Sequence, residues 1–310
     1  MTEEGFDRRC LPATAMIGQW TARDGARLRT IAFAPDGPAR GAILFASGRG
    51  DFAEKYLESL EHWRRHGWHV TAFDWRGQGG SGRGVAGPQI GHVDDFGPWV
   101  NDLAALIDDW RVQTPGPHVA IGHSMGGHLL MRCLAEHQPP LDGAVLCSPM
   151  FGIGGLPRWI ICALAMTMVK LGRGRQLALG QKLPKDLPHD RRAANLTGSA
   201  QRYADERWWV ENHPELALGG ASWGWLAAAC RSFRRLGDRR LIARVRLPVL
   251  IVAAERDHVV QTSATIRLAR SLPDHALVLL PGAHELLREA DGPRLAAWAA
   301  IDEFLEVRTR

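Results

Sequence analysis

The chain has 310 residues, of which 45% are hydrophobic and 23% are charged, a composition typical of a folded globular protein. This composition excludes a disordered tail, a collagen-like fibre and a coiled coil, and the length suits one large core with or without a small inserted module. The 38 basic and 33 acidic side chains leave a net charge of +5. Without clustering on one face, so mild an excess does not indicate a nucleic-acid partner, and none is expected.

Strand-like and helix-like segments alternate through most of the chain. Residues 1–15 are expected to form a loose tail, and residues 16–35, around Asp24-Gly25, are expected to form a β-hairpin. Further strands are predicted at 41–48, 69–74, 118–122, 143–147, 248–254 and 276–280. Helices are predicted at 53–66, 93–112, 125–137 and 294–307. This alternation predicts an α/β fold, with a mostly parallel central sheet and helices on both of its faces.

One interval interrupts the alternation. About a hundred residues between Cys147 and Leu247 contain no clear strand, but they include apolar helical stretches at 159–171 and 222–236 and five of the twelve tryptophans. We therefore predict that residues 151–240 form a helical cap, inserted into an α/β core made of residues 1–150 and 241–310.

The cysteines and the N-terminal residues bear on the compartment. The five cysteines are scattered, odd in number and never spaced as C-x-x-C, which predicts reduced thiols and a cytoplasmic location. The first ten residues carry acids where a secretory signal peptide needs bases. The longest apolar run, at 159–169, is shorter than the ~20 residues of a membrane-spanning helix, so any membrane contact is expected to be peripheral.

The sequence Gly122-His123-Ser124-Met125-Gly126 is the most informative motif. It matches G-x-S-x-G and lies between a predicted strand and a predicted helix, which is the setting of a nucleophile elbow. Such a turn lifts the serine hydroxyl above the strand end, while the glycines on either side admit neighbouring segments. Backbone N–H groups at the helix start can then bind a developing oxyanion. The alternative is a chance match in a chain with 34 glycines.

A serine hydroxyl needs a base, and the base needs an orienting acid. In the order Ser…Asp/Glu…His, Asp257 follows the predicted strand 248–254 and His284 follows the predicted strand 276–280. Carboxyl ends of strands are where open α/β sheets place their sites, so we predict that these two side chains join Ser124. Glu255 lies closer to its strand, and His258 comes too early in this order.

A second oxyanion donor is expected in the loop Ser47-Gly48-Arg49-Gly50, which follows the predicted strand 41–48. We predict that the backbone N–H groups of Arg49 and Met125 bind the oxyanion together. A plain glycine turn is the alternative interpretation of this loop.

Several segments resemble the bacterial lysophospholipase and monoacylglycerol lipase branch of the α/β-hydrolase superfamily. They are SGRGDFAEKY (47–56), FDWRGQGGSGR (73–83), HVDDF (92–96), IGHSMGG (121–127), AAERDHVV (253–260) and GAHELLRE (282–289). The resemblance implies an α/β-hydrolase fold, a catalytic triad of Ser124, Asp257 and His284, and oxyanion N–H groups from Arg49 and Met125. It also implies a small ester or lipid substrate, with no cofactor or metal. Many relatives have His-Gly before the oxyanion residue where this chain has Ser-Gly, a change that retains the backbone donors but bears on substrate preference.

Other activities and ligands stay open beside this interpretation. A thioesterase, a peptidase or a perhydrolase can use the same triad, and an idle ligand-binding protein can keep the same scaffold. The stretch from Gly48 to Ala53 also fits the G-x-G-x-x-A pattern of a dinucleotide-binding loop, with Asp74 ending the next predicted strand. His62 and His66 share a helix face, but no acid or cysteine of the sequence completes a zinc set with them.

Two further stretches have both a purely structural and a functional interpretation. Residues 231–246 hold seven arginines against one acid, which favours a solvated face over a contact with anionic lipid headgroups. The apolar stretch 159–171 and the neighbouring tryptophans fit an acyl pocket, a membrane-surface contact or ordinary packing within the cap. The sequence has no pattern that fixes an oligomeric state.

Overall fold

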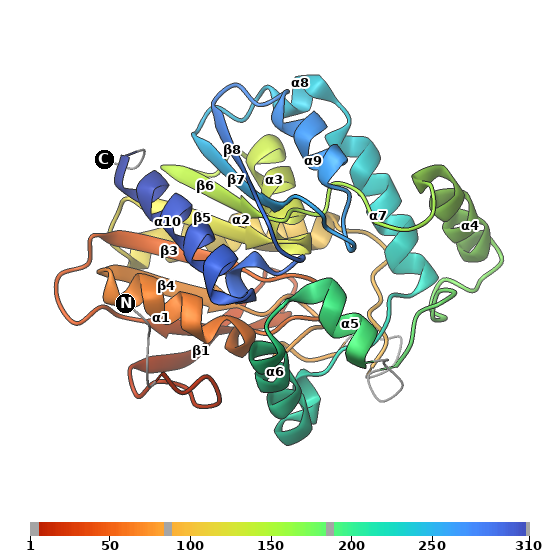
Figure 1. Ribbon diagram of the computed structural model, residues 1–310. Helices are drawn as coiled ribbons and strands as arrows, with labels where there is room; N and C mark the ends of the chain where they lie inside the picture. The colour runs from red at the N-terminus through yellow and green to blue at the C-terminus, as the bar shows by residue number, and fades with distance from the viewer. Residues whose placement is uncertain (1–5, 84–88, 184–188, 308–310) are drawn as a thin grey trace.

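A central sheet of eight strands organises the computed structural model, which describes residues 6–83, 89–183 and 189–307 (Figure 1). The strands are β1 (Ala15–Thr21), β2 (Arg27–Phe33), β3 (Gly41–Ala46), β4 (Trp68–Phe73), β5 (His118–His123), β6 (Gly143–Cys147), β7 (Val249–Ala254) and β8 (His275–Leu280). Their order in the sheet is β1-β2-β4-β3-β5-β6-β7-β8. From β4 to β8 all neighbours are parallel, whereas β2 is antiparallel to both β1 and β4. The predicted hairpin and the mostly parallel sheet are confirmed.

The helices that cover the sheet follow the predicted alternation. They are η1 (Ala53–Tyr56), α1 (Leu57–Arg65), α2 (Gly97–Gln113), α3 (Met125–Glu136), α9 (Thr262–Ala269), η4 (Leu286–Arg288) and α10 (Asp291–Val307). Helix α2 begins at Gly97 rather than at 93, because Asp95 accepts a hydrogen bond from the Gly97 N–H and Pro98 fixes the first turn. The short helix α9 was not predicted.

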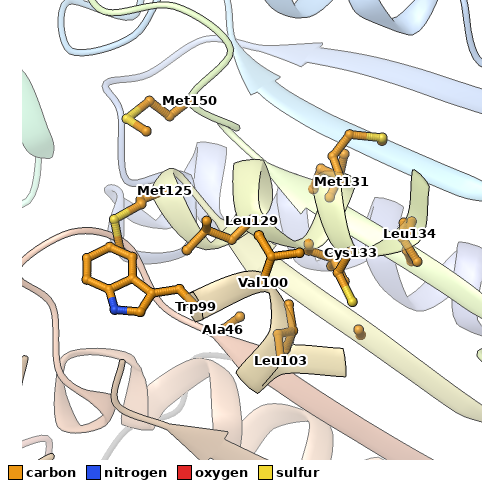
Figure 2. Close-up of a cluster of buried hydrophobic side chains, with 14 of the residues drawn as sticks. Ala46, Trp99, Val100, Leu103, Met125, Leu129, Met131, Cys133, Leu134 and Met150 are labelled. Carbon is orange, nitrogen blue, oxygen red and sulfur yellow. The ribbon is translucent and has the colours of Figure 1, made fainter. Parts of the chain in front are cut away.

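Helices α1 and α10 pack on one face of the sheet, and α2, α3 and α9 pack on the other (Figure 1). Strand β3, in the middle of the sheet, is buried over its whole length, as expected for a strand covered on both faces. Figure 2 shows part of the second face, where Leu129 of α3 lies near Val100 and Leu103 of α2. This packing fixes the start of α3, and therefore the turn before it, against the sheet.

The segment between β6 and β7 is helical. It contains α4 (Arg158–Lys170), α5 (His189–Leu196), α6 (Ala200–Asn212), η3 (Pro214–Leu216), α7 (Trp223–Leu236) and α8 (Arg239–Ile242). Helix α4 lies at the right edge of the view, next to α7 (Figure 1). None of the described helices combines the length and the hydrophobicity needed to cross a bilayer.

The expectation that all five cysteines are reduced thiols is wrong. Cys162 of α4 and Cys230 of α7 form a disulfide, with their Cα atoms 5.6 Å apart, whereas five reduced thiols were expected. Their spacing in the sequence, 68 residues, gave no indication that two packed helices would bring them together. Cys10, Cys133 and Cys147 are free, and the latter two are buried.

The described part of the N-terminal stretch is not a loose tail. Arg8 and Arg9 both form ion pairs with Asp205 of α6, and Trp209 of the same helix donates a hydrogen bond to the Arg8 carbonyl. Residues 6–14 are therefore held against α6, while residues 1–5 lie outside the described part of the chain.

Candidate active site

Ser124 occupies a sharp turn between β5 and α3. Its φ of 52° and ψ of −114° lie in a region that non-glycine residues rarely adopt, so the surrounding packing has to hold the turn. A Cβ on Gly126 would collide with the carbonyl oxygens of Ala46 and Ser47, and a Cβ on Gly122 would lie 2.8 Å from the Gly126 carbonyl. Both glycines are therefore required for the close approach that the motif predicted.

The structure brings Ser124, His284 and Asp257 together. His284 Nε2 lies 2.9 Å from Ser124 Oγ, and His284 Nδ1 lies 2.6 Å from Asp257 Oδ2. The other carboxylate oxygen, Asp257 Oδ1, accepts the N–H groups of Val259 and Val260. All three side chains are buried or nearly so. This is the hydrogen-bonded chain of hydroxyl, imidazole and carboxylate that nucleophilic serine chemistry requires.

The charge state of Asp257 suits an orienting role. Burial alone would raise the pKa of Asp257, but the hydrogen bond from His284 and those from the Val259 and Val260 N–H groups outweigh it and lower the pKa below its usual value. The group therefore stays a carboxylate well into the acid range.

The loop after β3 lies directly beside Ser124. A Cβ on Gly48 would be 3.2 Å from Ser124 Cβ, so the backbone of Arg49 follows close to the hydroxyl. Among the described residues, neither the Arg49 N–H nor the Met125 N–H donates a hydrogen bond to the chain. Met125 is the first residue of α3, where a helix N–H has no partner within the helix. Both predicted oxyanion donors are thus free to bind a ligand oxygen.

A cavity of about 440 Å³ opens at Ser124 and His284. One part of its wall is apolar and comes from Met150, Ile153, Leu196, Leu218, Trp225 and Val260. Another part is polar and comes from Arg49, Gln181, Lys182, Arg192 and Asn195. The site therefore joins an apolar space to a basic, hydrogen-bonding one.

A buried charge cluster that sequence reasoning missed lies behind the site. The fully buried Lys55 ammonium contacts three carboxylates, those of Asp51, Glu206 and Glu285. Asp51 also accepts hydrogen bonds from the Gly48 N–H and the Tyr56 hydroxyl. The cluster therefore connects the loop after β3, helix α6 and the residue next to His284. The i, i+4 spacing of Asp51 and Lys55 was the only sequence pattern that pointed to it.

Lys55 keeps Asp51 ionised in the interior. Burial alone would raise the pKa of Asp51, but the Lys55 charge beside it lowers the pKa to about 2. The ring of His123 lies between those of Tyr56 and His284, and the charges of Asp51 and Asp257 only partly offset the effect of burial on its pKa. Burial lowers the pKa of His123 to about 3, and its proximity to His284 adds to the effect, so this ring is neutral.

The dinucleotide alternative is not supported by the loop after β3. The Gly48 N–H donates to Asp51 and the Gly50 N–H donates to Gln78, so these amides are already used by the chain's own side chains. Asp74 is fully buried and paired with Arg29, which removes it as a ribose ligand.

Two groups of potential metal ligands occur among the described residues. Asp302 of α10 lies 2.8 Å from His62, close to His66, so the expectation that no acid completes this pair was wrong. The second group consists of Asp51, His123 and Glu285, where Lys55 already compensates both carboxylates.

Two arginines of residues 231–246, both in α7, contact acidic residues of the chain or their backbone. Arg235 pairs with Glu136 of α3, and Arg231 lies near the Asp94 carbonyl and the Asp95 carboxylate. These contacts tie α7 to the core and fit the solvated-face interpretation.

A mostly parallel sheet, a strained serine at a strand-to-helix turn and a hydrogen-bonded Ser–His–Asp set together define an α/β-hydrolase. Solved structures agree on the fold. A soluble variant of monoglyceride lipase from Saccharomyces cerevisiae, in complex with a substrate analogue, superimposes with a TM-score of 0.78 at 18% identity, covering 96% of this chain and 97% of that one. Paleococcus ferrophilus monoacylglycerol lipase gives a TM-score of 0.71 at 20% identity, covering 90% and 98%.

The chain belongs to the α/β-hydrolase family described as "Serine aminopeptidase, S33", whose model matches residues 37–291. Lysophospholipase L2 of Escherichia coli strain K12 is 30% identical over 304 residues, which cover 92% of this chain and 86% of that protein. The probable lysophospholipase L2 of Haemophilus influenzae is 28% identical over 283 residues, covering 89% and 87%. Human monoglyceride lipase is 30% identical over 128 residues, covering 41% of each chain. The predicted superfamily and branch are confirmed.

Proposed function

We propose that this protein is a serine hydrolase that cleaves carboxylic esters of lysophospholipid- or monoacylglycerol-like lipids. The observation that carries the proposal is the hydrogen-bonded set of Ser124, His284 and Asp257 at a partly apolar cavity, with two backbone N–H groups beside it that have no partner among the described residues. The relatives named lysophospholipase L2, which align over most of their length, support an ester substrate over a peptide.

We assign the following roles in the reaction to these groups. Ser124 Oγ attacks the ester carbonyl while His284 Nε2 accepts its proton, and Asp257 stabilises the resulting imidazolium. The N–H groups of Arg49 and Met125 hold the negative oxygen of the tetrahedral intermediate. His284 then protonates the leaving alcohol, and a water molecule, deprotonated by His284, releases the fatty acid from Ser124.

Ser124→Ala tests this assignment. We expect the variant to lose several orders of magnitude in kcat on a monoacylglycerol, a lysophospholipid and a p-nitrophenyl ester, because the acyl-enzyme cannot form. A fluorophosphonate probe should label the unmodified protein at Ser124. An unlabelled Ser124 would favour the idle ligand-binding alternative, and unchanged turnover by the variant would contradict the triad. An aminoacyl amide and a thioester in the same panel test the peptidase and thioesterase alternatives.

We further propose that residues 151–240 act as a cap over the cavity and that α4 contacts a membrane surface. Residues 151–183 contain five basic and no acidic side chains. Trp159 is 73% exposed and Leu171, the residue after α4, is 64% exposed, so α4 and its C-terminal end present large apolar groups beside these cations. Apolar insertion and attraction to anionic lipid would act together at such a surface.

Vesicle sedimentation tests the membrane contact. We expect binding to vesicles that contain an anionic lipid, weaker binding to zwitterionic vesicles, and loss of binding in Trp159→Glu. Leu295→Glu is the matched control, because Leu295 is an exposed apolar residue of α10. Equal effects of the two substitutions would contradict a role for α4.

A cytoplasmic location is the last part of the proposal; the Cys162–Cys230 disulfide is at odds with it and therefore provides its test. Cytoplasmic thiols are generally kept reduced, so trapping with an alkylating reagent in cells should find both cysteines reduced if the protein resides there. Full oxidation in cells would contradict that location.

A further inference from the structure

Arg49 places a positive charge in the cavity wall without forming an ion pair among the described residues. Its Nη2 donates a hydrogen bond of 2.6 Å to the Gly219 carbonyl, and its guanidinium lies 5.2 Å over the Trp225 ring. Within the described chain, the buried Nε has no hydrogen-bond partner and no ion pair involves this side chain. The Arg49 guanidinium therefore retains N–H donor capacity that no group of the described chain uses.

Three other arginines that are buried or half-buried, Arg29, Arg192 and Arg288, are paired with carboxylates. Arg29 lies 2.7 Å from Glu54, Arg192 lies 2.7 Å from Glu206, and Arg288 lies 2.9 Å from Glu206. Although burial lowers the pKa of each of them, the carboxylates outweigh it and raise the pKa. For Arg49 the sign is reversed, since burial lowers the pKa to about 10, the charge of Asp51 offsets this only in part, and the charge of Arg192 adds to the lowering. An anion bound at Arg49 would supply the missing compensation.

The charges around the cavity favour an anionic ligand. Both acids that line the cavity already have cationic partners, Asp51 in Lys55 and Glu285 in Lys55 and Arg288. Lys182, a second lining cation, has no ion pair within the described residues. The polar part of the wall is therefore positive, and an arginine fork suits the oxygens of a phosphate group.

We propose that the Arg49 guanidinium binds the phosphate of the substrate's headgroup and so selects phosphate-bearing monoacyl lipids over neutral ones. This inference rests on the proposed ester hydrolase function. The backbone N–H of Arg49 lies beside Ser124, where the ester carbonyl reacts, and its side chain extends along the cavity wall to Trp225 and Gly219. In a lysophospholipid, a glycerol unit likewise separates the ester from the phosphate.

A structural role for Arg49 is the rival explanation, because its bond to Gly219 also holds the segment before α7. Arg83 offers a matched control, since it donates to the Ala217 carbonyl in the same segment but does not line the cavity. The readout is the ratio of kcat/KM for a lysophosphatidylglycerol to that for a monoacylglycerol with the same short acyl chain. Any loss common to both esters cancels in this ratio.

We expect Arg49→Met to lower the ratio by roughly 10- to 100-fold, the usual effect of losing a charge-assisted hydrogen bond, mainly through KM for the phosphate-bearing ester. Arg49→Lys should retain part of the preference, and Arg83→Met should leave the ratio unchanged. An equal fall for both esters in Arg49→Met, together with a lower melting temperature, would overturn the inference in favour of the structural role.

Binding to Ser124→Ala separates this inference from the proposed function. We expect calorimetry to detect sn-glycerol 3-phosphate bound to this variant, and to detect no binding once Arg49→Met is added. Inorganic phosphate binding as tightly as glycerol phosphate would overturn the headgroup assignment in favour of a free-anion site. If the unmodified protein cleaved neither ester, the proposed function would fail, while the calorimetry would still decide whether Arg49 binds a phosphate ester.

Discussion

Lys55→Met is expected to cost about 3–5 kcal/mol of unfolding free energy at neutral pH, the usual cost of removing one partner from a buried ion pair. Methionine keeps the length of the side chain but leaves Asp51, Glu206 and Glu285 without their shared cation. Arg288 still pairs with the two glutamates, which places the expectation towards the lower end of this range. For a chain of this size the loss corresponds to a fall of about 5–8 °C in melting temperature.

The cost should shrink as the pH falls. With Lys55 present, the pKa of Asp51 is lowered to about 2, so its contribution to stability is complete above the ordinary pKa of an aspartate and is lost progressively as the pH falls from that value through 2. Without Lys55, burial raises the pKa of Asp51 above its unfolded value. Acid then favours the folded variant, because protonation removes the uncompensated charge.

Urea unfolding at pH 7 and pH 5, followed by tryptophan fluorescence, measures both effects. Lys170→Met is the control, because Lys170 is exposed on α4, and we expect its effect to stay within about 0.5 kcal/mol. A cost for Lys55→Met below about 1 kcal/mol at pH 7, or a cost that grows at pH 5, would refute the role assigned to Lys55.

Two further predictions concern the site and the disulfide. Asp257→Asn should lower kcat for ester cleavage by about a thousandfold or more without unfolding the protein, because the imidazole loses its orienting carboxylate. Steady-state kinetics measure the loss, and circular dichroism checks the fold. A loss under tenfold would contradict the role of Asp257. Reducing the Cys162–Cys230 bond should lower the free energy of unfolding by up to about 4 kcal/mol, because the bond closes a loop spanning 68 residues. Calorimetry with and without dithiothreitol measures this loss, with Cys10→Ser as the control. An unchanged melting temperature would contradict the prediction.

The sheet and the reacting groups could be predicted because each depends on a local pattern. Continuous apolar runs identify strands buried on both faces, and a glycine on either side of a serine identifies a turn that only a close approach explains. Asp257 and His284 followed from chain order and from their places after two strands. Their convergence, with distances of 2.6 and 2.9 Å along the hydrogen-bonded chain, is a consequence of the parallel sheet.

Contacts between charged groups far apart in sequence could not be predicted in this way. Glu206 and Glu285 are 151 and 230 residues from Lys55 along the chain, and a lysine near a helix start usually indicates a solvated face. Asp302 reaches His62 for the same reason, through the packing of α10 on α1. Composition reports which charges exist, whereas only the folded chain decides which of them are buried together.

The distribution of buried charge implies that α6 and α4, two helices of the segment between β6 and β7, differ in how easily they can be displaced from the core. Helix α6 carries Glu206 into the Lys55 cluster and joins Arg202 to Glu58 of α1, so moving this helix would leave several buried charges uncompensated. Helix α4 makes no such contact among the described residues, and it is held by the Cys162–Cys230 bond and a small apolar cluster around Ala165. If the cavity opens to admit a lipid, it opens at the α4 end, because displacement there breaks no buried ion pair among the described residues, while the Cys162–Cys230 bond keeps α4 attached to α7. The exposed apolar side chains of the insertion lie at that same end, so a membrane surface that engaged α4 would act on the part of the insertion that is free to respond.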